Sequence, residues 1–153
     1  MAPAAASRIL VQRGVYDRVV EGMAARYRAL RAGPALADLD LGPLVSERQR
    51  RIVGGYLDRA AGLCLAAEGT IVADAPAGGH YCAPRLFADV PPGHPLAQEE
   101  VFGPVVVVIP FDDEAEAVAI ANGTPFGLVA AVWTRASRID RAPSRVQTAA
   151  TRP

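Results

Sequence analysis

The sequence predicts an α/β fold, an incomplete three-layer sandwich with a mostly parallel sheet. Two apolar stretches indicate strands that are buried on both faces, "VVVVI" at 105–109 and "LVAAVW" at 128–133. Segments with helical spacing alternate with strand-like segments along the chain, which is typical of this fold class. A length of 153 residues suits one domain with a hydrophobic core, and a hydrophobic content of 51% excludes a disordered chain.

The first third of the chain predicts a strand followed by two helices. Residues 7–12 form the predicted strand, and residues 14–30 form the first helix, whose apolar residues recur at steps of four and three. The dipeptide "GP" at 33–34 ends this helix. Ser46 and Gln49 have the spacing of a capping box and predict the start of the second helix. The inner face of the second helix is expected to carry Ile52, Val53, Tyr56, Leu57 and Ala60.

The remainder predicts further strands and one more helix. Residues 69–90 contain two short strand candidates around a glycine-rich turn. After the strand at 105–109, Asp113 and Glu116 are expected to cap a helix with the sequence "EAEAVAIAN". Residues 126–134 then return as another buried strand. This alternation continues the α/β pattern.

The pattern stops at Arg135. From there to the end of the chain, five arginines stand against the single acidic residue Asp140, and the apolar residues are scattered. We therefore expect residues 1–135 to form one domain with an incomplete fold, and residues 136–153 to be an Arg-rich tail that is irregular or frayed.

Composition and charge argue against several classes of function. The basic tail has no interleaved aromatic residues, so we expect no nucleic-acid partner. No apolar run approaches the ~20 residues needed to span a bilayer, and the first residues lack the pattern of a secretory signal. We expect no membrane association, a cytoplasmic location and two reduced cysteines, Cys64 and Cys82.

Five segments together resemble the aldehyde dehydrogenase superfamily. In order along the chain they are "SRILVQRGVYDRVVEGM", "LGPLVSERQRRIVGGYLDRA", "GHYCAPRLFADV", "QEEVFGPVVVV" and "EAVAIANGTPFGLVAAVWT". One such segment is a weak signal, whereas five in the family's order and approximate spacing are specific. The resemblance covers about residues 7–135 and implies an incomplete aldehyde-dehydrogenase-like catalytic domain, from about the catalytic cysteine onward.

The resemblance implies a cofactor role for the "EEVFGP" motif. The family's second glutamate lies by the nicotinamide ribose of NAD or NADP, and its phenylalanine packs beside the nicotinamide. These roles fall on Glu100 and Phe102. A carboxylate can accept hydrogen bonds from both ribose hydroxyls, which fixes the sugar. Without the resemblance, Glu99 and Glu100 would more simply cap a strand end, with Phe102 in the core. We expect Glu100 and Phe102 to lie at one edge of the sheet, partly exposed.

The same resemblance indicates which parts of the chemistry are lacking. The family's nucleophilic cysteine lies four residues before the serine that is Ser7 here, and that position holds Pro3, which has no nucleophile. The family's glutamate base, oxyanion asparagine and cofactor domain precede this point. We therefore expect no catalytic residue, no independent activity, and no NAD or NADP binding by this chain alone.

The remaining reactive residues do not supply a substitute. Cys64 is expected at an apolar helix end and Cys82 in a strand-like segment, and neither has a neighbouring base. His80 and His94 are isolated loop histidines without the spacing of metal ligands, so they are expected at the surface and no metal site is predicted.

Two functional interpretations follow. In the first, the chain is part of an NAD(P)-dependent aldehyde dehydrogenase, which oxidises an aldehyde to a carboxylic acid and acts with a complementary aldehyde dehydrogenase chain. In the second, it is a non-catalytic remnant or interaction module that keeps only the fold segment. Self-association is the other partnership expected. Strands that are apolar on both faces need cover, and the predicted helices at about 14–30, 47–61 and 113–122 would cover one face of the sheet and only part of the other.

Overall fold

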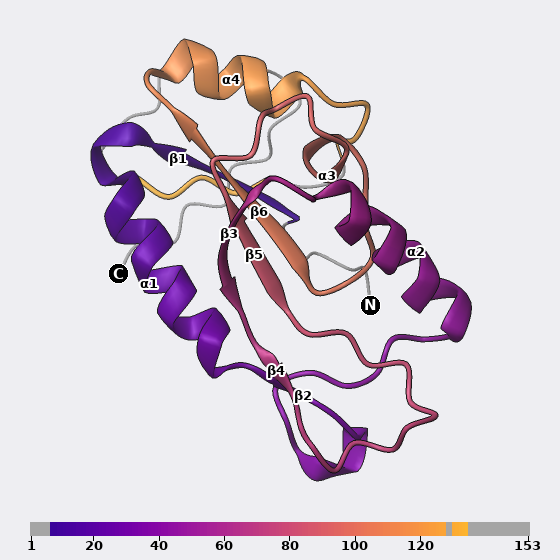
Figure 1. The fold of residues 1–153 in the computed structure, drawn as a ribbon. Helices are drawn as coiled ribbons and strands as arrows, with labels where there is room; N and C mark the ends of the chain where they lie inside the picture. Colours follow the sequence, from indigo (N-terminus) through magenta and orange to yellow (C-terminus); the bar gives the residue numbers. More distant parts are fainter. Residues whose placement is uncertain (1–6, 128–129, 135–153) are drawn as a thin grey trace.

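A computed structural model describes residues 7–127 and 130–134. Its centre is a four-stranded sheet in the order β1-β6-β5-β3 (Figure 1). The strands are β1 (Arg8–Gln12), β3 (Cys64–Glu68), β5 (Arg85–Ala88) and β6 (Val105–Phe111). The three strands β1, β6 and β5 are parallel, and β3 is antiparallel to β5. The predicted α/β fold with a mostly parallel sheet is therefore confirmed.

Helices cover both faces of the sheet, which confirms the three layers. They are α1 (Tyr16–Ala29), α2 (Glu47–Arg59), α3 (Pro95–Gln98) and α4 (Glu114–Asn122). In Figure 1, α1 lies on one side of the sheet and α2 and α3 lie on the other. Successive side chains of β6 point to opposite faces. Val107 accordingly packs with residues of α2, α3 and α4, and Val108 packs with residues of α1.

Smaller elements extend one end of the molecule. The strands β2 (Arg31–Ala32) and β4 (Thr70–Ile71) form a second, parallel two-stranded sheet. Two single 3₁₀ turns are present, η1 (Arg13–Val15), which leads into α1, and η2 (Ala35–Ala37). The strand pair β2–β4 lies below the main sheet in Figure 1, away from α4.

The predicted helix caps are confirmed. The Ser46 hydroxyl accepts a hydrogen bond from the backbone N–H of Gln49 at 3.1 Å. The Asp113 carboxylate accepts one from the N–H of Glu116 at 2.9 Å, and the Glu116 carboxylate accepts one from the N–H of Asp112 at 2.7 Å. Each cap satisfies an N–H group that has no partner within its helix.

Three expectations about local structure were wrong. Cys64 begins strand β3 and does not lie at a helix end. Ile52 is exposed, because the inner face of α2 passes through Val53 and Tyr56, about a quarter-turn away. Residues 126–127 and 130–134 form no strand, and Phe126 and Trp133 are exposed.

Three further expectations fall outside the residues that the structure describes. They concern Pro3, residues 128–129 of the expected last strand, and the tail over 136–153. Within 7–127 and 130–134, no helix is both long and apolar enough to cross a membrane.

Candidate cofactor site

The "EEVFGP" motif forms the loop that leads from α3 into β6. Because β1 and β6 are parallel, their amino ends meet, and Arg8 lies opposite Val107. The Val107 N–H donates a hydrogen bond to the Ser7 carbonyl at 3.1 Å. The motif loop and the start of β1 therefore lie at the same end of the sheet.

Glu100 and Phe102 are both exposed, as expected from the sequence. The expected place at an edge of the sheet needs correction, because β6 lies between β1 and β5. The two residues precede the amino end of an inner strand, where the loop emerges from the sheet.

Phe102 has an unusual backbone conformation. Its φ angle is +49°, in the left-handed region that bulky residues rarely adopt, and its side chain is 61% exposed. An exposed phenylalanine held in a strained conformation needs a specific restraint, and such strain is concentrated at functional sites.

The two adjacent glutamates have different surroundings. Glu99 accepts a hydrogen bond from the Tyr56 hydroxyl at 2.7 Å and lies 4.0 Å from the Arg59 guanidinium. That guanidinium also lies over the Tyr56 ring, 4.2 Å from its centroid. The hydrogen bond to Glu99 raises the pKa of Tyr56. Glu100, by contrast, has no hydrogen bond or ion pair among the residues described, so both of its carboxylate oxygens can accept bonds from a ligand.

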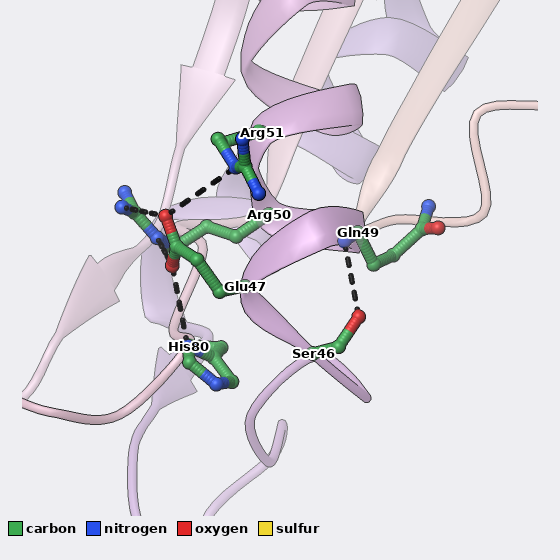
Figure 2. A network of polar contacts seen from close by, with 6 residues as sticks. All are labelled: Ser46, Glu47, Gln49, Arg50, Arg51 and His80. Atoms are coloured by element: carbon green, nitrogen blue, oxygen red, sulfur yellow. Dashed lines mark hydrogen bonds and ion pairs between the residues drawn. The ribbon is translucent and has the colours of Figure 1, made fainter.

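Gln49 of α2 restrains the centre of the loop. Its side-chain amide donates hydrogen bonds to the carbonyls of Val101 and Phe102, each at 3.1 Å. Figure 2 shows the Gln49 side chain on the opposite side of α2 from Glu47 and His80. The Gln49 side chain therefore does not bond back to the Ser46 N–H, as the second hydrogen bond of a capping box would require.

The other side of α2 carries an ion-pair cluster around Glu47 (Figure 2). Its carboxylate accepts hydrogen bonds from Arg50 at 2.7 Å, and it lies 3.3 Å from His80 and 3.9 Å from Arg51. The hydrogen bond from Arg50 lowers the pKa of Glu47. This cluster joins α2 to the loop before β5 and does not reach the motif.

An open cavity of about 350 Å³ lies behind the motif loop. It is lined by Asp40, Leu41, Gly42, Leu44, Cys82, Gly103 and Pro104. Glu100 and Phe102 do not line it, so the loop presents these two side chains at the surface rather than into the cavity.

His94, Cys82 and Cys64, the remaining candidate residues, lie in settings that do not indicate a reactive site. His94 caps α3, since its Nδ1 accepts a hydrogen bond from the Leu96 N–H at 3.2 Å. Cys82 is half-buried, and burial raises the pKa of its thiol, which opposes formation of a thiolate. Cys64 is exposed on β3. No group of three or more His, Cys, Asp or Glu side chains within 7–127 and 130–134 could hold a metal ion.

Sequence reasoning did not identify Gln49 and Tyr56 as residues of this site. Both contacts join segments more than 40 residues apart. The available signal was the spacing of Gln49, Val53 and Tyr56, which places all three on one face of a helix.

Comparison with known proteins gives the class. Residues 3–151 match the model of the aldehyde dehydrogenase family, and the chain belongs to that family. The resemblance inferred from the five ordered segments is thereby confirmed.

Two relatives have the name betaine aldehyde dehydrogenase. The protein of Rhizobium leguminosarum bv. trifolii is 38% identical over 145 residues, which are 92% of this chain and 30% of that protein. The protein of Cereibacter sphaeroides is 41% identical over 132 residues, which are 84% of this chain and 26% of that protein. The chain thus spans less than a third of the length of these relatives.

Solved structures agree with the fold. A candidate aldehyde dehydrogenase from Burkholderia cenocepacia superposes with a TM-score of 0.86 at 53% identity, over 89% of this chain and 29% of that one. A 1-pyrroline-5-carboxylate dehydrogenase from Thermus, solved with bound NAD, superposes with a TM-score of 0.77 at 38% identity, over 88% of this chain and 26% of that one. The chain therefore has the fold of part of an aldehyde dehydrogenase.

Proposed function

We propose that this chain supplies the nicotinamide-ribose portion of the NAD(P) site of an aldehyde dehydrogenase. In this proposal the Glu100 carboxylate accepts hydrogen bonds from two ribose hydroxyls, and Phe102 packs beside the nicotinamide. The observation that carries the proposal is the Glu100 carboxylate, which has no partner among the described residues, beside an exposed Phe102 in the "EEVFGP" motif of a family member.

The side chains present suit that portion of the cofactor. A carboxylate with two free oxygens matches the paired hydroxyls of a ribose, and an exposed aromatic ring can pack on a flat heterocycle. When bound, the cofactor would accept hydride from the substrate. NAD and NADP are identical at the nicotinamide ribose, so this site does not discriminate between them.

The reaction also requires a nucleophile that these residues do not supply. Position 3 holds Pro3, and burial raises the pKa of the Cys82 thiol. Cys64 lies at the end of β3 away from the motif, whereas Glu68 lies at the end near the motif. We infer that oxidation of an aldehyde to an acid needs residues from elsewhere, such as a complementary aldehyde dehydrogenase chain. The purified chain should therefore give no aldehyde-dependent reduction of NAD or NADP, and it should not bind either cofactor tightly.

A chimera tests the cofactor role. Residues 7–135 of this chain would replace the matching segment of the Burkholderia enzyme, whose fold the chain shares with a TM-score of 0.86, so that the enzyme keeps its own residue at the position of Pro3. In the chimera, Glu100→Gln should raise the KM for NAD(P) by about tenfold, since charge-assisted hydrogen bonds are worth about 1.5–3 kcal/mol. Glu21→Gln, on the exposed face of α1, is the matched control and should leave the KM unchanged.

Three outcomes would count against this function. An unchanged KM in Glu100→Gln would remove the cofactor role. Turnover by the chain alone that survives both Cys64→Ala and Cys82→Ala would show that the missing thiol is not needed. A chimera that folds but binds no cofactor would favour the alternative, a non-catalytic interaction module.

A cytoplasmic location remains a prediction.

A further inference from the structure

We propose that one face of α2, formed by Gln49, Val53 and Tyr56, is a positioning device that fixes the motif loop so that Glu100 and Phe102 are presented for ligand binding. This inference rests on the proposed cofactor role for its purpose, although the positioning itself can be measured without a cofactor. None of the three residues is proposed to touch the reacting atoms.

The first contact restrains the backbone at Phe102. The Gln49 amide has two N–H donors, and it makes one hydrogen bond to each of two successive carbonyls, those of Val101 and Phe102. Both acceptors are oxygen atoms, so the orientation of the amide is defined by its partners. This double contact fixes the peptide unit between the two carbonyls and offsets the strain of the left-handed Phe102.

The second contact requires a glycine after Phe102. A Cβ atom at Gly103 would lie 2.6 Å from Cγ2 and 3.2 Å from Cγ1 of Val53, which is 1% exposed and cannot move away. The loop backbone therefore packs directly against the buried face of α2. Only glycine permits this approach.

The third contact gives the two glutamates different directions. Tyr56 holds the Glu99 carboxylate at 2.7 Å, and Arg59 reinforces it. Glu99 has an extended backbone, with φ −120° and ψ 157°, so the next side chain is directed to the opposite side of the chain. With Glu99 turned onto α2, Glu100 is turned away from it.

The three contacts act as a unit. Steps of four and three place Gln49, Val53 and Tyr56 on one face of the helix, and each holds a different part of the loop. A rigid helix with its own N-terminal cap thereby sets the geometry of a loop that has no regular structure of its own.

Backbone order parameters from ¹⁵N relaxation of the full chain test the positioning. A rigid backbone gives values of about 0.85, and a flexible one gives values below about 0.6. Gln49→Met keeps the length of the side chain and removes both donors, so residues 100–103 should fall into the flexible range while β6 is unchanged. Arg48→Met, at the exposed neighbouring position, is the control and should leave the loop rigid.

A pH profile separates hydrogen bonding from packing. In Gln49→Glu, the ionised carboxylate would face two carbonyl oxygens at neutral pH, and the loop should be flexible. Near pH 4 the protonated acid can donate one hydrogen bond, so order should partly return, whereas the unaltered chain should show no such change. A loop that stays rigid in both Gln49 variants at neutral pH would overturn the proposal.

A rescue experiment tests the glycine contact. Gly103→Ala should loosen the loop, and Gly93→Ala, where a Cβ meets nothing within 4 Å, should not. Adding Val53→Ala to Gly103→Ala removes both clashing methyl groups and should restore loop order relative to Gly103→Ala alone. Absence of rescue would contradict the role given to Val53.

The chimera distinguishes failure of this inference from failure of the proposed function. If Gln49 acts only through the loop, Gln49→Met should raise the KM for NAD(P), and combining it with Glu100→Gln should add little to Glu100→Gln alone. A loop that loosens without any change in KM would uphold the positioning and reject the cofactor role. A loop that stays rigid would reject the positioning whatever the KM does.

Discussion

At the residue scale, identical neighbours have different tasks. Glu99 and Glu100 are adjacent in sequence, yet one is held by Tyr56 and the other has no partner among the described residues. The sequence was enough to single out Glu100, because the family resemblance gives the ribose-binding role to the second glutamate of the motif. It could not identify Tyr56, because that contact exists only after α2 packs beside the loop.

Removing the Tyr56 hydroxyl should have a measurable cost. Tyr56→Phe deletes the hydrogen bond to the half-exposed Glu99, so we expect the free energy of unfolding to fall by about 1 kcal/mol, measured by urea denaturation. Tyr27→Phe is the matched control, because the Tyr27 hydroxyl has no hydrogen-bond partner among the described residues. Equal losses in the two variants would show that the contact with Glu99 contributes nothing.

The cluster around Glu47 predicts a dependence of stability on pH. The hydrogen bond from Arg50 lowers the pKa of Glu47 in the folded chain, so the folded state binds its proton less readily than the unfolded state. The stabilisation is therefore present above about pH 4.3, the ordinary value for glutamate, and is lost as the pH falls through the lower folded value.

Glu47→Gln should remove this part of the acid sensitivity. We expect the variant to be less stable than the unaltered chain at pH 7, and the two stabilities to converge once the pH has fallen below the lowered pKa of Glu47 in the folded state, where the carboxylate is protonated in both states. Added salt should narrow the difference at pH 7, because the pair is exposed. The control Glu21→Gln, on α1, should have the same stability as the unaltered chain at every pH. If Glu47→Gln lowered the stability by the same amount at every pH, the acid sensitivity assigned to Glu47 would be wrong.

At the element scale, the elements with local signals were predicted and those defined by tertiary contacts were not. The caps of α2 and α4 follow from Ser46 and Asp113, whose side chains act within one helical turn. Strand β3 was missed because its alanine-rich sequence lacks β-branched residues, and a register shift between Leu65 and Ala67 breaks its alternation. Its pairing with β5 defines it.

One side chain connects β1 to the end of α4. The Arg8 guanidinium donates hydrogen bonds to two carbonyls of the last turn, those of Ile120 at 3.2 Å and Ala121 at 2.7 Å. The Ile120 carbonyl also accepts one from the Gly123 N–H at 3.2 Å. Arg8→Met should lower the free energy of unfolding by about 1–2 kcal/mol, measured by chemical denaturation. Arg18→Met, at an exposed position of α1, should change it by less than about 0.5 kcal/mol. Similar losses in both variants would reject the role of Arg8 as a cap.

At the scale of the whole molecule, the fold class was predictable and the strand order was not. The unbroken apolar run of β6 required cover on both faces, and the structure provides it with α1 on one face and α2, α3 and α4 on the other. The order β1-β6-β5-β3 depends on pairing between segments about 100 residues apart, for which the sequence contains no local signal. The expectation that one face of the sheet is only partly covered was therefore wrong, and the surfaces left for association are the edges of the sheet.

The exposed edges and apolar side chains predict self-association. Within the described part of the chain, β1 and β3 are the outer strands, and Leu65 on β3 is 46% exposed. An unpaired strand edge is a template for pairing with a second copy. Covering even ~400 Å² of apolar surface would be worth on the order of 10 kcal/mol before the costs of association, comparable with the stability of a whole domain. We therefore expect the mass measured by light scattering to rise with concentration, and the dye ANS to bind in dilute solution.

Leu65→Lys tests whether the β3 edge is responsible. A charge on an edge strand opposes pairing, so this variant should shift the mass toward the monomer and weaken dye binding. Val45→Lys replaces an exposed apolar residue of a loop and should leave both measurements unchanged. If Leu65→Lys associates like the unaltered chain, the contact lies elsewhere on the surface. A monodisperse monomer that melts cooperatively and binds no dye would mean that the chain closes its own core, and no partner would then be needed for its stability.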